Sequence, residues 1–222
     1  MDENRNPANE IKADNKGKKK VRKTWQQEVK EWVVALASAL IIVFVLQSFL
    51  FCLIRVDGHS MDTTLADGER LFVTVADIRF GPIERNSVVI CHYPNRTTRF
   101  LGIIPMKTNF VKRLVAVPGD TVYRENGVTH VVYPDENGEQ VDVALDERLA
   151  LYFVNGSPDD YEPYTLGENE YFAVGDNRYN SHDSRDWNDS DPVNDVGPIT
   201  KDMVIGRVRE VIWPLNSFRA TN

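Results

Sequence analysis

The sequence is short of cysteine. Its 222 residues include only Cys52 and Cys91, the first in a long apolar run and the second in a run typical of a β-strand. Two cysteines so placed do not indicate a disulfide framework. A domain of this size can bury a sufficient core without one. We therefore expect two unpaired and mostly buried thiols.

Basic charge is also missing from most of the chain. Residues 1–31 carry nine Lys or Arg and six Asp or Glu, a net +3, and the whole chain carries −7, so the remainder carries −10. Nucleic-acid binding requires a basic footprint, so no nucleic-acid partner is expected. Residues 120–170 hold thirteen acids and two bases, which indicates a solvated acidic insertion containing hairpins.

One long apolar run is present. No charge occurs between Trp32 and Ile54, and as a helix these 23 residues would span about 34 Å, enough for the hydrocarbon core of a bilayer. The run is too long for the apolar part of a cleavable signal peptide, and its small residues stand at the wrong end. A basic arm, residues 1–31, precedes it. By the positive-inside rule, a single-pass anchor over residues 32–54 would leave the N-terminus in the cytoplasm and residues 55–222 outside.

Long helical patterns are lacking after residue 55. Instead, strand-like runs occur at residues 69–75, 87–93, 110–117, 120–133, 170–174 and 203–213, separated by turn signals such as "PGD", "ENG" and "VGDN". The predicted fold class is mostly β: coiled antiparallel sheets or a partly closed β-barrel, behind one N-terminal transmembrane helix.

A serine follows the apolar run, in "GHSMDTTL" (58–65). A serine hydroxyl becomes a nucleophile only when a base takes its proton. His59 adjoins Ser60 and would point to the opposite face of an extended strand, while His92 and His130 lie in predicted strands. His182, beside an aspartate in "NSHDSRDW", is the histidine kept as an alternative base.

A lysine is the other candidate base. In "FVKRLVAVPGD" (110–120), strand alternation places Phe110, Lys112 and Leu114 on one face. Burial among apolar side chains lowers the pKa of a lysine and so makes it a base near neutral pH. On this pattern alone, Lys112 is either such a base or a surface lysine whose stem lies along apolar side chains.

Three separated stretches resemble the bacterial type I signal peptidases, membrane-anchored enzymes that cut signal peptides from exported proteins. "GHSMDTTL" resembles the family's serine box, G-x-S-M-x-P-T-L. "VKRLVAVPGD" resembles its lysine box, K-R-x-x-x-x-P-G-D, and "GDNRYNSHDSRDW" its G-D-N-R-x-x-S-x-D-S-R box. Their order behind a single N-terminal span also fits, and the resemblance extends to about Val208.

The resemblance implies a Ser-Lys dyad, with Ser60 as nucleophile and Lys112 as general base and later as the acid that protonates the leaving amine. The backbone N–H of Ser60 would bind the oxyanion. Some members add a side-chain hydroxyl two residues before the nucleophile, where this chain has Gly58, as in Gram-positive-like members. No metal or organic cofactor is implied.

The third box supplies the supporting residues. Ser181 matches the family serine that hydrogen-bonds and orients the lysine. Asp183 and Arg185 match an ion pair behind the site, and Asp176 and Arg178 belong to the same supporting loop.

The resemblance also implies cleavage after small residues of the Ala-X-Ala type in the signal peptides of exported preproteins. The signal peptide would dock by strand addition beside residues 56–60 and 110–112. The matching pocket walls are Val56, Met61, Leu65, Phe110 and Val111. Expected partners are signal peptides and membrane lipid, with the protein export machinery as a further candidate, and the expected location is the cytoplasmic membrane.

Departures from the family pattern keep two other hypotheses open. Thr63 stands where the serine box has proline, and the middle box, usually R-G-D-x-V-x-F, reads "RNSVVIC". A sortase-like cysteine transpeptidase would use Cys91 with a histidine. A non-catalytic, secretion-associated binding module would need neither Cys91 nor a histidine for its function. An Asp-rich insert after Trp187 lacks the glycine and closing glutamate of an EF-hand, so no calcium site is predicted.

Overall fold

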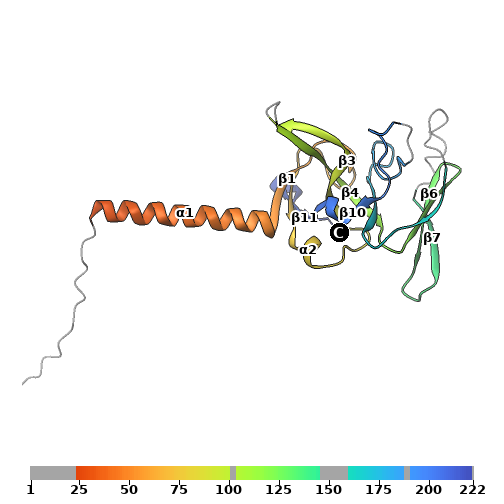
Figure 1. Ribbon diagram of the computed structural model, residues 1–222, viewed down its shortest axis with the longest axis horizontal. Helices are drawn as coiled ribbons and strands as arrows, with labels where there is room; N and C mark the ends of the chain where they lie inside the picture. The colour runs from red at the N-terminus through yellow and green to blue at the C-terminus, as the bar shows by residue number, and fades with distance from the viewer. Residues whose placement is uncertain (1–23, 101–103, 146–159, 188–190, 222) are drawn as a thin grey trace, which may run out of the picture. The chain divides into compact units, whose positions relative to one another are not determined.

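The structure is a computed structural model that describes residues 24–100, 104–145, 160–187 and 191–221. It divides into two compact units, Met1–Val43 and Phe44–Asn222. Helix α1 (Trp25–Phe49) begins in the first unit (Figure 1). Its segment Trp25–Leu46 is long and apolar enough to cross a membrane.

The helix differs from the predicted span at both ends. It begins at Trp25, so part of the predicted basic arm is helical, while residues 1–23 of that arm lie outside the described residues. It ends at Phe49, and the last part of the apolar run forms strand β1 (Phe51–Arg55). β1 pairs with a neighbouring strand, which satisfies the backbone hydrogen bonds along one of its edges, and this tertiary pairing is not visible in the hydrophobicity of the run.

The first sheet is antiparallel and carries the predicted strand runs. Its order is β1–β2–β11–β3–β4–β9–β10, with β12 beside β11. The bounds are β2 (Arg70–Thr74), β3 (Val88–Phe100), β4 (Ile104–Ala116), β9 (Glu170–Val174), β10 (Ile199–Thr200), β11 (Val204–Trp213) and β12 (Arg219–Ala220). Among the residues that the structure describes, short helical segments connect them: α2 (Ala76–Phe80), η2 (Lys201–Met203) and η3 (Leu215–Ser217).

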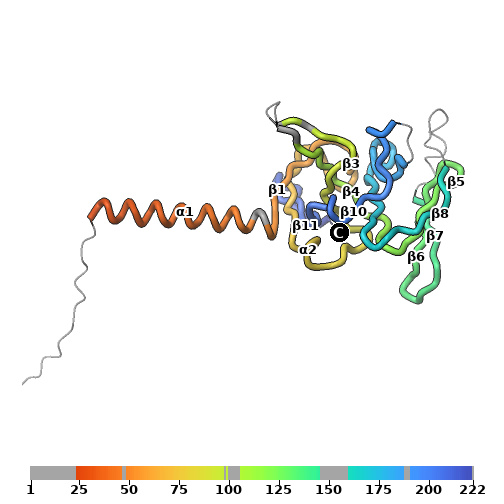
Figure 2. Tube along the Cα trace, viewed as in Figure 1, coloured from red at the N-terminus to blue at the C-terminus, as the bar shows by residue number. Residues whose placement is uncertain are grey.

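The acidic insertion forms a second antiparallel sheet (Figure 2). Its order is β7–β6–β5–β8, built from β5 (Thr121–Glu125), β6 (Val128–Pro134), β7 (Gln140–Ala144) and β8 (Tyr161–Thr165). The predicted strand over 120–133 is thus a hairpin, because Asn126 and Gly127 turn with positive φ. Residues 146–159 of the insertion lie outside the described residues.

Three buried clusters hold the sheets together. Two lie against the first sheet, around Leu114 and around Leu71, and a third around Phe172 joins the two sheets. The mostly β, antiparallel class is confirmed. Within the described residues both sheets remain open, with β1 and β10 as the end strands of the first and β7 and β8 of the second, so no closed barrel forms.

Candidate active site

Ser60 and Lys112 meet although fifty-two residues separate them. Lys112 Nζ and Ser60 Oγ are 2.6 Å apart and hydrogen-bonded. Lys112 lies on β4. Ser60 lies in a turn between β1 and β2, not in the extended segment expected around it. The strand alternation argument about the neighbouring His59 therefore does not apply; its Nδ1 lies 3.2 Å from Asp62, and the hydrogen-bond partner of Ser60 is Lys112.

Local sequence explains this turn. Leu65 N donates to Met61 O at 2.8 Å, and both side chains are 1% exposed, so a helix-like turn is fixed to the core on one side. Gly58 has φ +109°, a value that glycine adopts without strain. Thr63 has φ +90°, whereas the proline of the family pattern fixes φ near −65°. The turn is therefore built differently from one that contains proline.

Lys112 is enclosed on all sides. Its residue is 2% exposed, it stands opposite Val89 across β3, and its Nζ lies 5.5 Å from the centre of the Phe110 ring. This burial lowers the pKa of Lys112 to about 8, against opposing effects of Asp183 and Cys91. Lys112 is therefore not a surface lysine, and near neutral pH a fraction of the protein molecules carries it as the neutral amine, which can act as a base.

A buried carboxylate lies behind the dyad. Asp183 is 0% exposed and accepts hydrogen bonds from Ser181 Oγ at 2.6 Å, Gly175 N at 3.0 Å and Arg185 Nε at 2.9 Å. Burial raises its pKa, but the charge and hydrogen bonds of Arg185, with those of Ser181 and Gly175, outweigh burial and lower it. Asp183 therefore remains an anion, and its charge favours the protonated form of Lys112.

Ser181 does not have the expected partner. The resemblance implies a hydrogen bond to Lys112, whereas the Ser181 hydroxyl donates to Asp183, and no bond between Ser181 and Lys112 joins the described parts of the chain. The single hydroxyl proton of Ser181 is directed to the fully buried Asp183 carboxylate, a charged acceptor 2.6 Å away. Ser181 thus acts on the lysine through the carboxylate.

The loop that begins at Gly175 packs directly on the turn that contains Ser60. Asn177 N donates to Ser60 O at 3.0 Å, and its side chain donates to His59 O at 2.9 Å. A Cβ at Gly175 would lie 2.1 Å from Ser181 Oγ and 2.4 Å from Ser60 O. Glycine is thus required here because Ser181 and Ser60 approach its backbone closely, and not because of a positive φ. The role of Asn177 was missed from the sequence, although it stands within the quoted box.

Asp176 links the two segments that carry Ser60 and Lys112. It accepts two hydrogen bonds from Arg113, at 2.9 and 2.7 Å, and one from Thr64 Oγ1 at 2.5 Å. Arg113 follows the lysine on β4 and Thr64 belongs to the serine turn, so this carboxylate ties one to the other. Arg178 is farther away: its carbonyl accepts a bond from Arg185 at 3.0 Å.

The expected pocket walls do not share one open surface. Val56, Met61 and Leu65 are 4%, 1% and 1% exposed in the cluster around Leu71. Val111 is partly buried against that cluster, while Phe110, on the opposite face of β4, packs on the cluster around Leu114.

The expected docking strand at 56–60 is also absent, because β1 ends at Arg55 and the chain then turns. The other expected segment is extended. β9 pairs with β4 only from Arg113 to Ala116, so this edge of β4 has no strand partner among the described residues before Arg113.

The alternative catalytic residues are engaged elsewhere. Cys91 is 0% exposed on β3, and burial raises the pKa of its thiol, which disfavours a nucleophilic thiolate. His182 Nδ1 lies 2.9 Å from Asp186, and its ring stacks on Tyr93 at 5.4 Å. Neither residue is hydrogen-bonded to Ser60, whose partner is the lysine.

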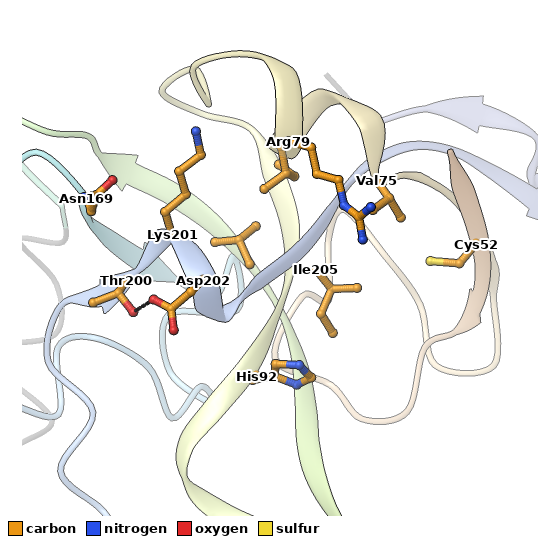
Figure 3. Close-up of a pocket in the computed structure, with 11 residues that line it drawn as sticks. Cys52, Val75, Arg79, His92, Asn169, Thr200, Lys201, Asp202 and Ile205 are labelled. Atoms are coloured by element: carbon orange, nitrogen blue, oxygen red, sulfur yellow. Dashed lines mark hydrogen bonds between the residues drawn. The ribbon is translucent and has the colours of Figure 1, made fainter. Parts of the chain in front are cut away.

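The surface also has a depression whose lining residues do not include Ser60 or Lys112. Figure 3 shows His92, Cys52, Arg79 and Lys201 around its rim. Its remaining lining residues are Val75, Ile78, Asn169, Thr200, Asp202, Val204 and Ile205. Lys201 Nζ donates to Gly81 O at 3.3 Å, and Thr200 donates to Asp202. The hydroxyl in this depression, that of Thr200, is paired with the exposed carboxylate of Asp202, whereas that of Ser60 is paired with the buried amine of Lys112.

Comparison with known proteins gives one consistent result. Residues 29–213 match the profile of the family described as signal peptidase, peptidase S26. The chain is 31% identical over 216 residues to signal peptidase I S of Bacillus subtilis, covering 96% of this chain and all of the relative. It is 32% identical over 199 residues to signal peptidase I of Bacillus licheniformis (86% and 92% covered) and 28% identical over 203 residues to signal peptidase IB of Staphylococcus aureus (87% and 94% covered). A crystal structure of a signal peptidase I from Enterococcus faecalis is 23% identical, with a TM-score of 0.33 over 56% of this chain and 95% of that one.

Proposed function

The chain belongs to the signal peptidase family, peptidase S26, and is a serine endopeptidase; from this premise we propose that it removes signal peptides from exported preproteins with a Ser60–Lys112 dyad. The observation that carries the proposal is the 2.6 Å contact between Ser60 Oγ and the buried Lys112 Nζ. This contact gives the serine a base with a pKa of about 8.

The chemistry follows from this pair. Neutral Lys112 takes the proton of Ser60 as its Oγ attacks the carbonyl carbon of the scissile bond. The resulting ammonium donates that proton to the leaving amine, and an acyl-enzyme on Ser60 remains. A water molecule, deprotonated by the same lysine, then hydrolyses the ester and frees the serine.

The oxyanion of each tetrahedral intermediate needs a donor. The backbone N–H of Ser60 makes no hydrogen bond with any described residue, so it is available to an incoming oxygen. Gly58 supplies no hydroxyl, and its own N–H donates to Asp67 at 2.9 Å. This arrangement supports a single backbone donor from the nucleophile itself.

Four further residues position the dyad without touching substrate. Asp183, held by Arg185 and Ser181, keeps an anion near Lys112, and Asp176 holds the serine turn to β4. Such a network fixes the distance between nucleophile and base. Distance matters because a general base must lie within hydrogen-bond reach of the proton it takes, directly or through one water.

Substrate binding is proposed at the open edge of β4. An extended segment could add as a strand along residues 110–112 and bring its carbonyl to Ser60. Ala-X-Ala specificity is proposed on the family membership alone, because Val56, Met61 and Leu65 are buried in the core.

Helix α1 is proposed to anchor the protein in the cytoplasmic membrane by a single pass. The basic arm before it would remain in the cytoplasm and residues 55–222, the catalytic domain, would lie outside. Signal peptides are themselves membrane-inserted, so such an anchor keeps enzyme and cleavage site in the same layer.

The proposal is tested by cleavage of a purified preprotein in proteoliposomes containing wild type, Ser60→Ala or Lys112→Ala. We expect both variants to be folded and inactive, and sequencing of the wild-type product to begin after a small residue. Activity retained in Lys112→Ala would refute the dyad, and His182→Ala would then be the next variant to assay.

A further inference from the structure

One residue of the loop after β9, Asn177, holds the backbone on both sides of Ser60. Its backbone N–H donates to the carbonyl of Ser60 at 3.0 Å, and its side-chain amide donates to the carbonyl of His59 at 2.9 Å. These two carbonyls belong to the two peptide groups that flank the Cα of Ser60. Because each peptide group is planar, holding both of them leaves the backbone of the serine little freedom to rotate.

The bond to the His59 carbonyl also fixes the direction of a neighbouring N–H. The peptide group that carries this carbonyl carries the N–H of Ser60, and in a trans peptide the two point in opposite directions. With the carbonyl held toward the side chain of Asn177, the Ser60 N–H is directed away from it. This N–H makes no hydrogen bond within the described parts of the chain and is the proposed donor to the oxyanion.

The turn that contains Ser60 holds this peptide group less firmly by itself. Among the described residues, the His59 carbonyl accepts one further bond, from Asp62 N at 3.2 Å, at the long end of the usual range. Ser60 lies between two residues with positive φ, Gly58 at +109° and Thr63 at +90°, so neither a helix nor a strand continues through it. The direction of the Ser60 N–H therefore depends on the neighbouring loop.

The side chain of Asn177 is committed to this one contact. It makes no other hydrogen bond among the residues that the structure describes. A carbonyl that accepts a hydrogen bond polarises its peptide group, and this strengthens the N–H of the same group as a donor. Because Gly58 supplies no hydroxyl, the strength and direction of the single Ser60 N–H matter more than they would beside a second donor.

We propose that Asn177 is a positioning residue for the oxyanion: its side-chain amide aims the N–H of Ser60 at the carbonyl oxygen of the scissile bond. It acts through the peptide group between His59 and Ser60 and not by contact with the reacting atoms. The inference rests on the proposed function and names the residue that prepares the oxyanion site of that reaction. Its role differs from that of Asp176, which ties the whole turn to β4 through Arg113.

The test compares two substrates that differ by one atom, with the full chain in detergent. A signal-peptide analogue with an ester at the scissile position is paired with its thionoester, in which sulfur replaces the carbonyl oxygen. Sulfur is a weak hydrogen-bond acceptor, so the ratio of kcat/KM for the ester to that for the thionoester reports the bond to the oxyanion. The intrinsic reactivities of the two substrates cancel when this ratio is compared between variants.

We expect the wild type to favour the ester. Asn177→Ala keeps the Ser60 N–H but loses its support, so kcat for the ester should fall about tenfold to a hundredfold, with KM and the thionoester rate nearly unchanged. The ratio should therefore fall by the same factor. The rise of the rate with pH should remain centred near pH 8, because the contact between Ser60 and Lys112 is not altered.

Two further variants sharpen the comparison. Asn177→Asp keeps the shape of the side chain but lacks the N–H that the His59 carbonyl accepts, so its ratio should fall as in Asn177→Ala. This variant decides the outcome if the alanine variant does not fold. Asn180→Ala is the matched control: it removes the same kind of side chain from an exposed position of the same loop, where that side chain makes no hydrogen bond with the described residues. It should keep the wild-type rate and ratio.

An equal loss of rate for both substrates in the Asn177 variants would show that the side chain only supports the turn, and would overturn the proposal. A wild-type enzyme without preference for the ester would overturn it as well, since the Ser60 N–H would then not bind the oxyanion. Ester hydrolysis that persists in Ser60→Ala would instead refute the proposed function, a result distinct from a failure of Asn177 alone.

Discussion

The pH dependence of cleavage should report the titration of Lys112. Burial lowers its pKa to about 8. At pH 7 about one lysine in ten is then neutral, against about one in 2,500 for an ordinary lysine with a pKa near 10.4. Because the base must be unprotonated, kcat/KM should rise about tenfold per pH unit below pH 8 and level off above it.

The assay is the initial rate of cleavage of a signal-peptide substrate in detergent across this range, at substrate concentrations well below KM. A limb centred near pH 6.5 would instead indicate a histidine and refute the reasoning. Lys112→Met, which keeps the bulk of the side chain, should have no activity at any pH.

The same shift affects stability. Folding lowers the Lys112 pKa from 10.5 to about 8, so the native state binds fewer protons than the unfolded state and gains stability as pH rises between these values. Below pH 8 this lowered pKa corresponds to a cost of about 3 kcal/mol for the buried ammonium, and the opposing effect of Asp183 is already contained in that pKa. In urea denaturation at pH 7, Lys112→Met should therefore be the more stable protein by about 2 kcal/mol, with the difference shrinking towards pH 10. Equal stability at both pH values would contradict the burial of the amine.

Substitutions at three further positions test the surroundings of the dyad. Gly175→Ala should abolish cleavage, since its Cβ would lie 2.1 Å from Ser181 Oγ and 2.4 Å from Ser60 O; near-wild-type kcat would show that the loops are not in contact. Thr63→Pro restores the residue of the family pattern but should destabilise the protein in thermal melts, because proline cannot adopt the φ of +90° found at this position. Thr63→Gly should stabilise the protein by about 1 kcal/mol. The opposite order of stability would contradict this turn. Asp176→Asn weakens a half-buried ion pair that joins the serine turn to β4. It should therefore lower the free energy of unfolding by about 2 kcal/mol and reduce kcat more than it changes KM. A change confined to KM would assign Asp176 to substrate binding.

Most of the sheet could be read from the sequence. The runs at 170–174 and 203–213 are strands at nearly those bounds, since alternating burial and turn residues are local signals. The sequence did not predict β1, which lies at the end of the apolar run. Hydrophobicity does not distinguish a membrane helix from a strand that pairs with a distant partner. The short β10 and β12 also depend on pairing alone.

The site was predicted less evenly. Residue identity and box order pointed to Ser60 and Lys112, and the structure brings their side chains together. The partner of Ser181 and the bridge made by Asp176 depend on loop packing, which no spacing rule encodes. Thr63 is the clearest case: the sequence shows the loss of proline, but only the backbone reveals a φ that proline could not adopt.

The most direct test of the central claim is to trap the acyl-enzyme. A signal-peptide analogue with an ester at the scissile position, mixed with the full chain and quenched by acid within milliseconds to seconds, should leave its acyl group covalently bound to the protein. Mass spectrometry of the digested protein should find that group on the peptide containing Ser60, and the label should vanish in Ser60→Ala and in Lys112→Met. Label on the peptide containing Cys91, or undiminished labelling without the lysine, would contradict the dyad.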